Sequence, residues 1–148
     1  MHKHDSALGV ATTLRPVQPV TLVRPHAARR AARFFVENFA GRAMYAVKAN
    51  PSPELLQELW AAGITHYDVA SIAEGRLVRQ VLPEAVLCLM HPVKAQEAIA
   101  EAYAAHGVRV FSLDSQEELE KIILATDGAD DLTLCVRLRV SSAHSKLS

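Results

Sequence analysis

Lys48 is the residue of this chain whose type and position most clearly indicate chemistry. It lies in the sequence YAVKAN at positions 45–50, and a proline follows. Side chains alternate along a strand, so Lys48 is expected to share a face with Met44 and Ala46. At the carboxyl end of a barrel strand its amine would be partly shielded from water, which favours the neutral, nucleophilic form. A carbonyl cofactor such as pyridoxal phosphate would be the natural partner of that amine.

Two other polar residues interrupt apolar runs, and their roles stay open at this point. Asp68 lies in the run HYDV, where it could also serve only to contact the start of the next helix. Arg137 lies within CVRL, and a buried arginine needs a carboxylate or phosphate partner. Arg139 shares its face by alternation, so either arginine could point inward. Lys48 itself could instead extend its ammonium into water at a strand end.

These residues lie on a repeated pattern of a short strand followed by a helix. Apolar runs begin near five positions that are roughly 19 to 24 residues apart, and each interval holds one helix-like segment. The runs AMYAV, AVLCLM, VRVFSL and LTLCVRL are nearly unbroken, which is typical of parallel strands buried on both faces. They begin near Ala43, His66, Ala85, Val108 and Leu132.

Local signals predict where the helices begin and end. Ser52 is expected to cap a helix that starts at Pro53, and Gly63 to end it. The pairs Ser71 with Glu74 and Ser115 with Glu118 have the S-x-x-E spacing of a capping box, which gives Glu74 a structural role as well as a possible acidic one. Further helices are predicted over 25–39, with an arginine-rich face, and over 93–106. Residues 1–19, which hold two threonines and two prolines, are predicted to be an extended or loose lead-in.

The pattern predicts an α/β fold, a partial (β/α)8 barrel made of about the first five strands with their helices. No G-x-G-x-x-G or G-x-x-x-x-G-K-[ST] turn follows any strand, so the usual phosphate turns of open nucleotide-binding sheets are missing. A closed barrel has eight strands and spans about 250 residues. This chain has 148 residues, so we expect it to be the N-terminal part of a larger barrel.

Composition excludes several classes of function. Sixteen basic residues balance 16 acidic ones, and half of the chain is apolar. Without a basic cluster, nucleic-acid binding is not expected. No run approaches the ~20 apolar residues of a membrane helix, and the N-terminus lacks the apolar core of a secretory signal. Two distant cysteines, Cys88 and Cys135, predict no disulfide framework or metal site. We therefore expect a cytoplasmic, globular protein.

Taken together, these motifs resemble the ornithine/lysine decarboxylase branch of the barrel-type pyridoxal-phosphate enzymes. The resemblance is carried by YAVKANPSPELLQELWAAGITHYDVASIAEGRLV, MHPVKAQEAIAEAYAAHGVRVFSLDSQEELEKI and CVRLRV, in that order, over roughly residues 20–148. It implies that Lys48 forms a Schiff base with pyridoxal phosphate. It further implies that Asp68 lies beside the cofactor as a negative charge and that Arg137 lines the cofactor pocket.

The resemblance also implies what the whole enzyme does. It would decarboxylate ornithine or lysine to a diamine, as in polyamine biosynthesis, and act as a homodimer. The glycine-rich phosphate loop, the glutamate at the pyridine nitrogen and the C-terminal β-domain of the family are expected after residue 148. We therefore expect the 148-residue chain alone to hold the cofactor weakly and not to turn over. Diaminopimelate decarboxylase and a non-catalytic binding or regulatory module are the alternatives.

Overall fold

The computed structural model describes residue 4 and residues 6–138. Five parallel strands form one sheet in the order β1-β2-β3-β4-β5, so each strand pairs with the next one along the chain. The strands are β1 (Met44–Ala46), β2 (His66–Val69), β3 (Val86–Leu89), β4 (Val110–Leu113) and β5 (Thr133–Val136). The helices are α1 (Ala7–Leu14), α2 (Pro25–Asn38), the 3-10 helix η1 (Val47–Ala49), α3 (Pro53–Ala61), α4 (Ile72–Val81), α5 (Gln96–His106) and α6 (Gln116–Ala125).

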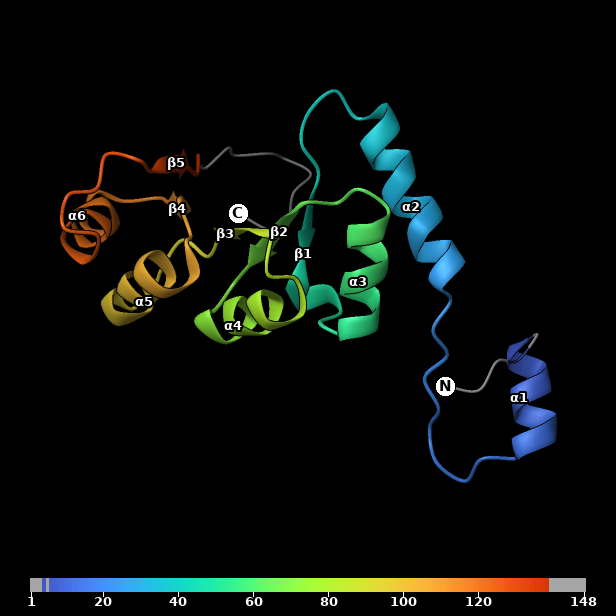
Figure 1. Cartoon of the computed structure of the whole chain (residues 1–148). Helices are drawn as coiled ribbons and strands as arrows, with labels where there is room; N and C mark the ends of the chain where they lie inside the picture. Colours follow the sequence, from blue (N-terminus) through green and yellow to red (C-terminus); the bar gives the residue numbers. More distant parts are fainter. Residues whose placement is uncertain (1–3, 5, 139–148) are drawn as a thin grey trace, which may run out of the picture.

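Helices α3 to α6 connect successive strands and lie along one face of the sheet in the same order as the strands (Figure 1). A parallel pair needs such a crossover, because the chain must return to the same end of the sheet before the next strand begins. The register pairs Ala46 with Asp68, and Asp68 with Cys88. The prediction of five barrel strands with intervening helices is confirmed.

The core lies between the sheet and these helices. Tyr67, Leu87 and Phe111 are fully buried there, each on a different strand. Because side chains alternate along a strand, Asp68 and Cys88 point to the opposite face, which would be the interior of a closed barrel. The sheet therefore has an apolar face against the helices and a more polar inner face.

The predicted helix starts are confirmed at Ser52 and Ser71. The Ser52 hydroxyl accepts from the Leu55 amide at 3.4 Å, and Pro53 occupies the first turn of α3. The Ser71 hydroxyl accepts from the Glu74 amide at 3.3 Å. Glu74 completes this cap by accepting from the Ala70 amide at 2.7 Å, which secures the turn between β2 and α4.

The second predicted capping box is only half correct. The Ser115 hydroxyl accepts from the Glu118 amide at 3.3 Å, as expected for a helix cap. The Glu118 carboxylate does not reach back to the start of its own helix, because Lys94 and Lys121 bind it instead. A long-range ion pair thus replaces the local hydrogen bond that the spacing predicted.

The prediction that residues 1–19 are extended or loose is wrong for residues 7–14, which form α1. The Ser6 hydroxyl accepts from the Gly9 amide at 3.0 Å and starts the helix. Thr12 is tolerated inside it because its hydroxyl donates to the Leu8 carbonyl at 2.9 Å. Arg15, with a φ of 42°, ends the helix in the left-handed conformation. Extended chain then joins α1 to α2 (Figure 1).

Candidate cofactor-binding site

Lys48 lies at the carboxyl end of β1, the edge of the sheet where we expected it. The strand itself ends at Ala46, and Lys48 belongs to the 3-10 helix η1. The prediction that the strand continues to Lys48 is therefore wrong. Lys48 is also exposed, so the expected shielding from water is not present. The inner face of a five-stranded sheet is open, which leaves the amine accessible.

The chain turns after Ala46 because two side chains fix the segment that follows. The Tyr45 hydroxyl donates to the Asn50 carbonyl at 3.1 Å, and the Asn50 side-chain oxygen accepts from the Ser52 amide at 3.0 Å. The second bond is an Asx turn, which leads directly into the cap of α3. Lys48 is thus carried on a short turn that is held at both ends.

Tyr67 supports this turn from the helix side of the sheet. Its ring packs edge-on against the Tyr45 ring at 6.3 Å between centroids, and its hydroxyl donates to the Leu56 carbonyl at 3.2 Å. Burial raises the pKa of both tyrosines, so both stay protonated donors at neutral pH. Sequence reasoning missed this role. The sequence feature that could have indicated it is the presence of one tyrosine, Tyr45 or Tyr67, within each of two successive apolar strands.

Asp68 is an acidic group whose pKa responds to the charge of Lys48. Its side chain is half-buried on the inner face of β2, and this burial raises the pKa of the carboxyl above its ordinary value. The positive charge of Lys48 opposes that rise, and the negative charge of Glu74 adds to it. The charges of Lys48 and Glu74 therefore both act on the carboxyl of Asp68, while its place beside a cofactor stays a prediction.

A groove of about 610 Å³ runs along the free side of β1 and reaches Asp68. Met44, Asp68 and Met90 line it from the sheet, and Phe35 and Phe39 line it from the region of α2. Lys48 is not among its lining residues. The groove is predominantly apolar, so Asp68 is its acidic feature.

Cys88 lies next to this region on the inner face of β3. Burial, with smaller effects of Cys135 and Asp68, raises the pKa of its thiol to about 11. The thiol therefore stays protonated at neutral pH. Cys88 packs as a small apolar residue, as expected, whereas Cys135 is only partly buried.

Arg137 is not brought to Lys48 and Asp68. It follows β5, its amide donates to the Leu113 carbonyl at 2.8 Å, and its side chain is exposed. Within residues 6–138 no carboxylate forms an ion pair with it. The expectation of a buried arginine is therefore wrong in this structure, because β5 is an outer strand of the sheet. Arg139 lies outside the described residues.

Comparison with known protein families identifies the class. Residues 26–148 match the model of the pyridoxal binding domain of the pyridoxal-dependent decarboxylases. The chain belongs to this family, and the predicted cofactor, pyridoxal phosphate, is confirmed as the cofactor of the family. Of the residues considered above, Lys48 offers the amine that such a cofactor requires.

Individual relatives are of two kinds. A lysine/ornithine decarboxylase of Selenomonas ruminantium is 37% identical over 89 residues, which are 60% of this chain and 22% of that protein. Human antizyme inhibitor 2 is 33% identical over 108 residues, which are 72% of this chain and 23% of that protein. The crystal structure of SrLDC in complex with PLP and cadaverine superposes with a TM-score of 0.77 at 27% identity, over 98% of this chain and 38% of that one.

This chain thus spans less than a quarter of the length of the curated relatives that it matches. Within the part that the structure describes, none of the helices is long and apolar enough to cross a bilayer.

Proposed function

We propose that this chain is the cofactor-holding part of a decarboxylase of basic amino acids, ornithine or lysine, and that Lys48 binds pyridoxal phosphate covalently. The observation that carries the proposal is the position of Lys48. Lys48 is exposed at the carboxyl end of a strand in a parallel α/β sheet. Its positive charge lowers the pKa of the Asp68 carboxyl, against the larger effect of burial. In barrels of this type, catalytic groups come from the carboxyl ends of strands.

Lys48 would hold pyridoxal phosphate through its amine, which would condense with the aldehyde of the cofactor and release the aldehyde oxygen as water. When bound, the cofactor supplies the electron sink that accepts the bonding electrons of a departing carboxylate. Asp68 supplies a negative charge beside the nitrogen of Lys48. The Tyr45–Asn50 contact keeps the turn that carries Lys48 in place.

The residues of this chain fit one end of the cofactor. Lys48 matches the aldehyde in chemistry and is accessible to it. Asp68 is held half-buried at the same edge, so it interacts with a positive nitrogen more strongly than it would in bulk water. Arg137 was predicted to line the pocket and stays a prediction, as do the homodimeric state and cytoplasmic location of the whole protein.

The substrate proposal rests on the relatives. One is a lysine/ornithine decarboxylase, and the superposed SrLDC structure holds cadaverine, a diamine. A product of that class comes from a basic amino acid that loses its carboxylate as carbon dioxide. We therefore propose a role in diamine and polyamine formation. Diaminopimelate remains the alternative substrate within the same enzyme class.

The non-catalytic alternative is supported by a separate observation. Antizyme inhibitor 2 matches a longer stretch of this chain than the decarboxylase does, at 33% identity over 108 residues. A binding module would use the same fold without reacting through Lys48. Covalent labelling of that residue therefore separates the two proposals.

The test is reduction with borohydride in the presence of pyridoxal phosphate, followed by peptide mapping. We expect the label on Lys48, and its complete loss in Lys48→Met. Lys121, whose ammonium binds Glu118, serves as the internal control for nonspecific labelling. Equal labelling of Lys48 and Lys121 would contradict the proposal. In the whole protein, release of labelled carbon dioxide from ornithine, lysine, arginine and diaminopimelate would identify the substrate.

A further inference from the structure

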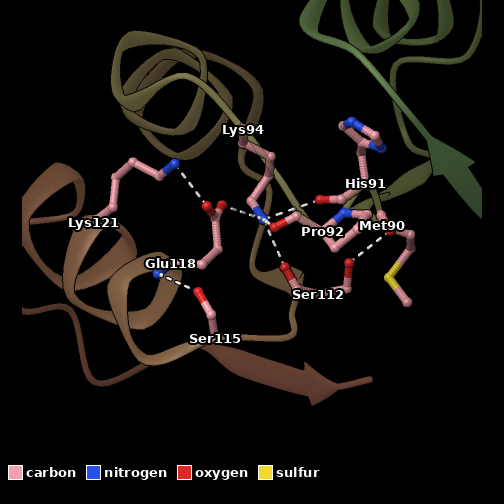
Figure 2. A network of polar contacts seen from close by, with 8 residues as sticks. All are labelled: Met90, His91, Pro92, Lys94, Ser112, Ser115, Glu118 and Lys121. Carbon is pink, nitrogen blue, oxygen red and sulfur yellow. Dashed lines mark hydrogen bonds and ion pairs between the residues drawn. The ribbon is translucent and has the colours of Figure 1, made fainter. Parts of the chain in front are cut away.

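The carboxyl ends of β3 and β4 are joined through a buried lysine that the proposed chemistry does not use. Lys94 lies between β3 and α5, and 2% of its side chain is exposed (Figure 2). Its ammonium donates to the main-chain carbonyls of His91 at 3.0 Å, Pro92 at 3.4 Å and Ser112 at 2.6 Å. An ammonium has three protons, so these three carbonyls take up its full capacity to donate.

Glu118 balances the charge of this ammonium. Its carboxylate lies 2.7 Å from Lys94 Nζ, and only 4% of its side chain is exposed. Its other oxygen lies 2.6 Å from the nitrogen of Lys121, whose side chain is 28% exposed (Figure 2). A buried lysine without such a partner would be strongly destabilising. The charges of the pair are therefore balanced and shielded from water, while Glu118 Oε1 accepts no hydrogen bond in addition to this ion pair.

This unit extends toward the candidate cofactor-binding site through Ser112 and Met90. The Ser112 hydroxyl donates to the Met90 carbonyl at 2.6 Å, and the Met90 amide donates to the Val69 carbonyl at 3.2 Å. Met90 lines the same groove as Asp68. An unbroken series of contacts thus leads from Lys94 to the segment beside Asp68.

We propose that Lys94 and Ser112 are positioning residues for the candidate cofactor-binding site. Lys94 binds the turn after β3 to the end of β4, Ser112 fixes the Met90 carbonyl, and together they hold Met90 beside Asp68. The Lys94 ammonium binds main-chain carbonyls that follow β3 and lie on β4, whereas Lys121 pairs with Glu118. The inference rests on the proposed function where it takes this edge to be the cofactor site.

The two lysines that bind Glu118 provide a matched pair of variants. Lys94→Met removes the contacts to the three carbonyls and one ion pair with Glu118, whereas Lys121→Met removes only the other ion pair with Glu118. We expect amide hydrogen exchange in the segments 88–95 and 110–115 to become about tenfold faster in Lys94→Met and to stay within about twofold in Lys121→Met. The same change in exchange in both variants would overturn the proposal.

A second readout reports on the cofactor. We expect Lys48 to be labelled by pyridoxal phosphate more slowly in Lys94→Met than in the unaltered chain. Before borohydride is added, the visible absorbance of the protein with bound cofactor should also be lower in Lys94→Met. Both properties should stay unchanged in Lys121→Met. A purely structural role would leave both properties of Lys48 unaltered in folded Lys94→Met, and that result would overturn the positioning role. If the unaltered chain is not labelled at Lys48, the proposed function fails, while the exchange pattern still decides the role of Lys94.

Ser112→Ala tests the same connection if Lys94→Met does not fold. It removes a single hydroxyl and leaves the Lys94–Glu118 pair in place. We expect exchange in the segment 88–95 to become several-fold faster, because the Met90 carbonyl loses its bond to Ser112. Unchanged exchange there would show that Ser112 does not fix Met90.

Discussion

Lys48 and Lys94 lie at the carboxyl ends of strands in one sheet, yet their surroundings are opposite. Lys48 follows β1 and is exposed, whereas Lys94 follows β3 and is buried against three carbonyls and Glu118. The Lys94 nitrogen is buried and faces carbonyls and a carboxylate, so an aldehyde has no access to it. The comparison shows that a lysine at this edge of the sheet can serve either to hold the strand ends together or to remain accessible, and that its carbonyl contacts decide which.

The largest expected effect is on the buried side of this comparison. Lys94→Met should lower the free energy of unfolding by about 3 kcal/mol, because it leaves the carboxylate of Glu118 buried with only Lys121 as partner. Urea denaturation followed by circular dichroism measures this loss. Lys121→Met is the control and should cost less than about 1 kcal/mol. Similar losses in the two variants would show that the carbonyl contacts of Lys94 add no stability.

The pH dependence of stability should report Glu118. Burial raises the pKa of this carboxyl, but the positively charged Lys121 and Lys94 outweigh burial together and hold the pKa below its ordinary value of 4.5. Its contribution to stability is therefore fully present above about pH 4.5 and is lost as the pH falls through the lower, folded-state pKa. Melting curves between neutral pH and pH 3 should fall more steeply for the unaltered chain than for Glu118→Gln. Parallel curves would contradict the assignment.

Asp68 should show the opposite sign with a smaller effect. Burial raises the pKa of its carboxyl above 3.8, so the folded state loses stability from Asp68 as the pH rises through the folded-state pKa. Asp68→Asn should therefore raise stability at neutral pH, by less than about 0.5 kcal/mol because the group is only half-buried. Thermal melts at pH 7 measure the change. A clear loss of stability would show that the charge of Asp68 is needed for folding.

Lys48 should have the smallest effect on stability. Lys48→Met is expected to change the free energy of unfolding by less than about 0.5 kcal/mol, because the side chain is exposed. The same variant should lose all labelling by pyridoxal phosphate and borohydride. A Lys48→Met variant that is as stable as the unaltered chain but is not labelled would differ clearly from Lys94→Met, whose main expected effect is a loss of stability. A large loss of stability would place Lys48 among the structural lysines.

Features that depend on neighbouring residues could be predicted from the sequence. The caps at Ser52, Ser71 and Ser115 and the stop at Gly63, whose φ is 102°, follow from local spacing and are present. The parallel order of the strands follows from their regular alternation with helices. The edge that carries Lys48 could be predicted for the same reason.

Features that depend on distant residues could not be predicted. Ser112 and Lys94 are 18 positions apart, and the S-x-x-E spacing at Ser115 assigned Glu118 to its own helix. The end of β1 depends on the contact between Tyr45 and Asn50, which no propensity indicates. The exposure of Arg137 depends on what lies beside β5. The helix over residues 7–14 is a different case, because its Ala and Leu residues favour a helix and its two hydroxyl contacts are local, so the sequence did carry a signal for it.

The outer position of β1 has a consequence for Lys48. Within the described part of the chain, β1 pairs with β2 on one side only, so its other side offers main-chain groups to any strand that aligns with it. A strand added there would also bring side chains over η1 and the groove beside it. Completion of the sheet would then also shield the Lys48 amine from water, so that one assembly event would close the edge of β1 and cover the groove beside it.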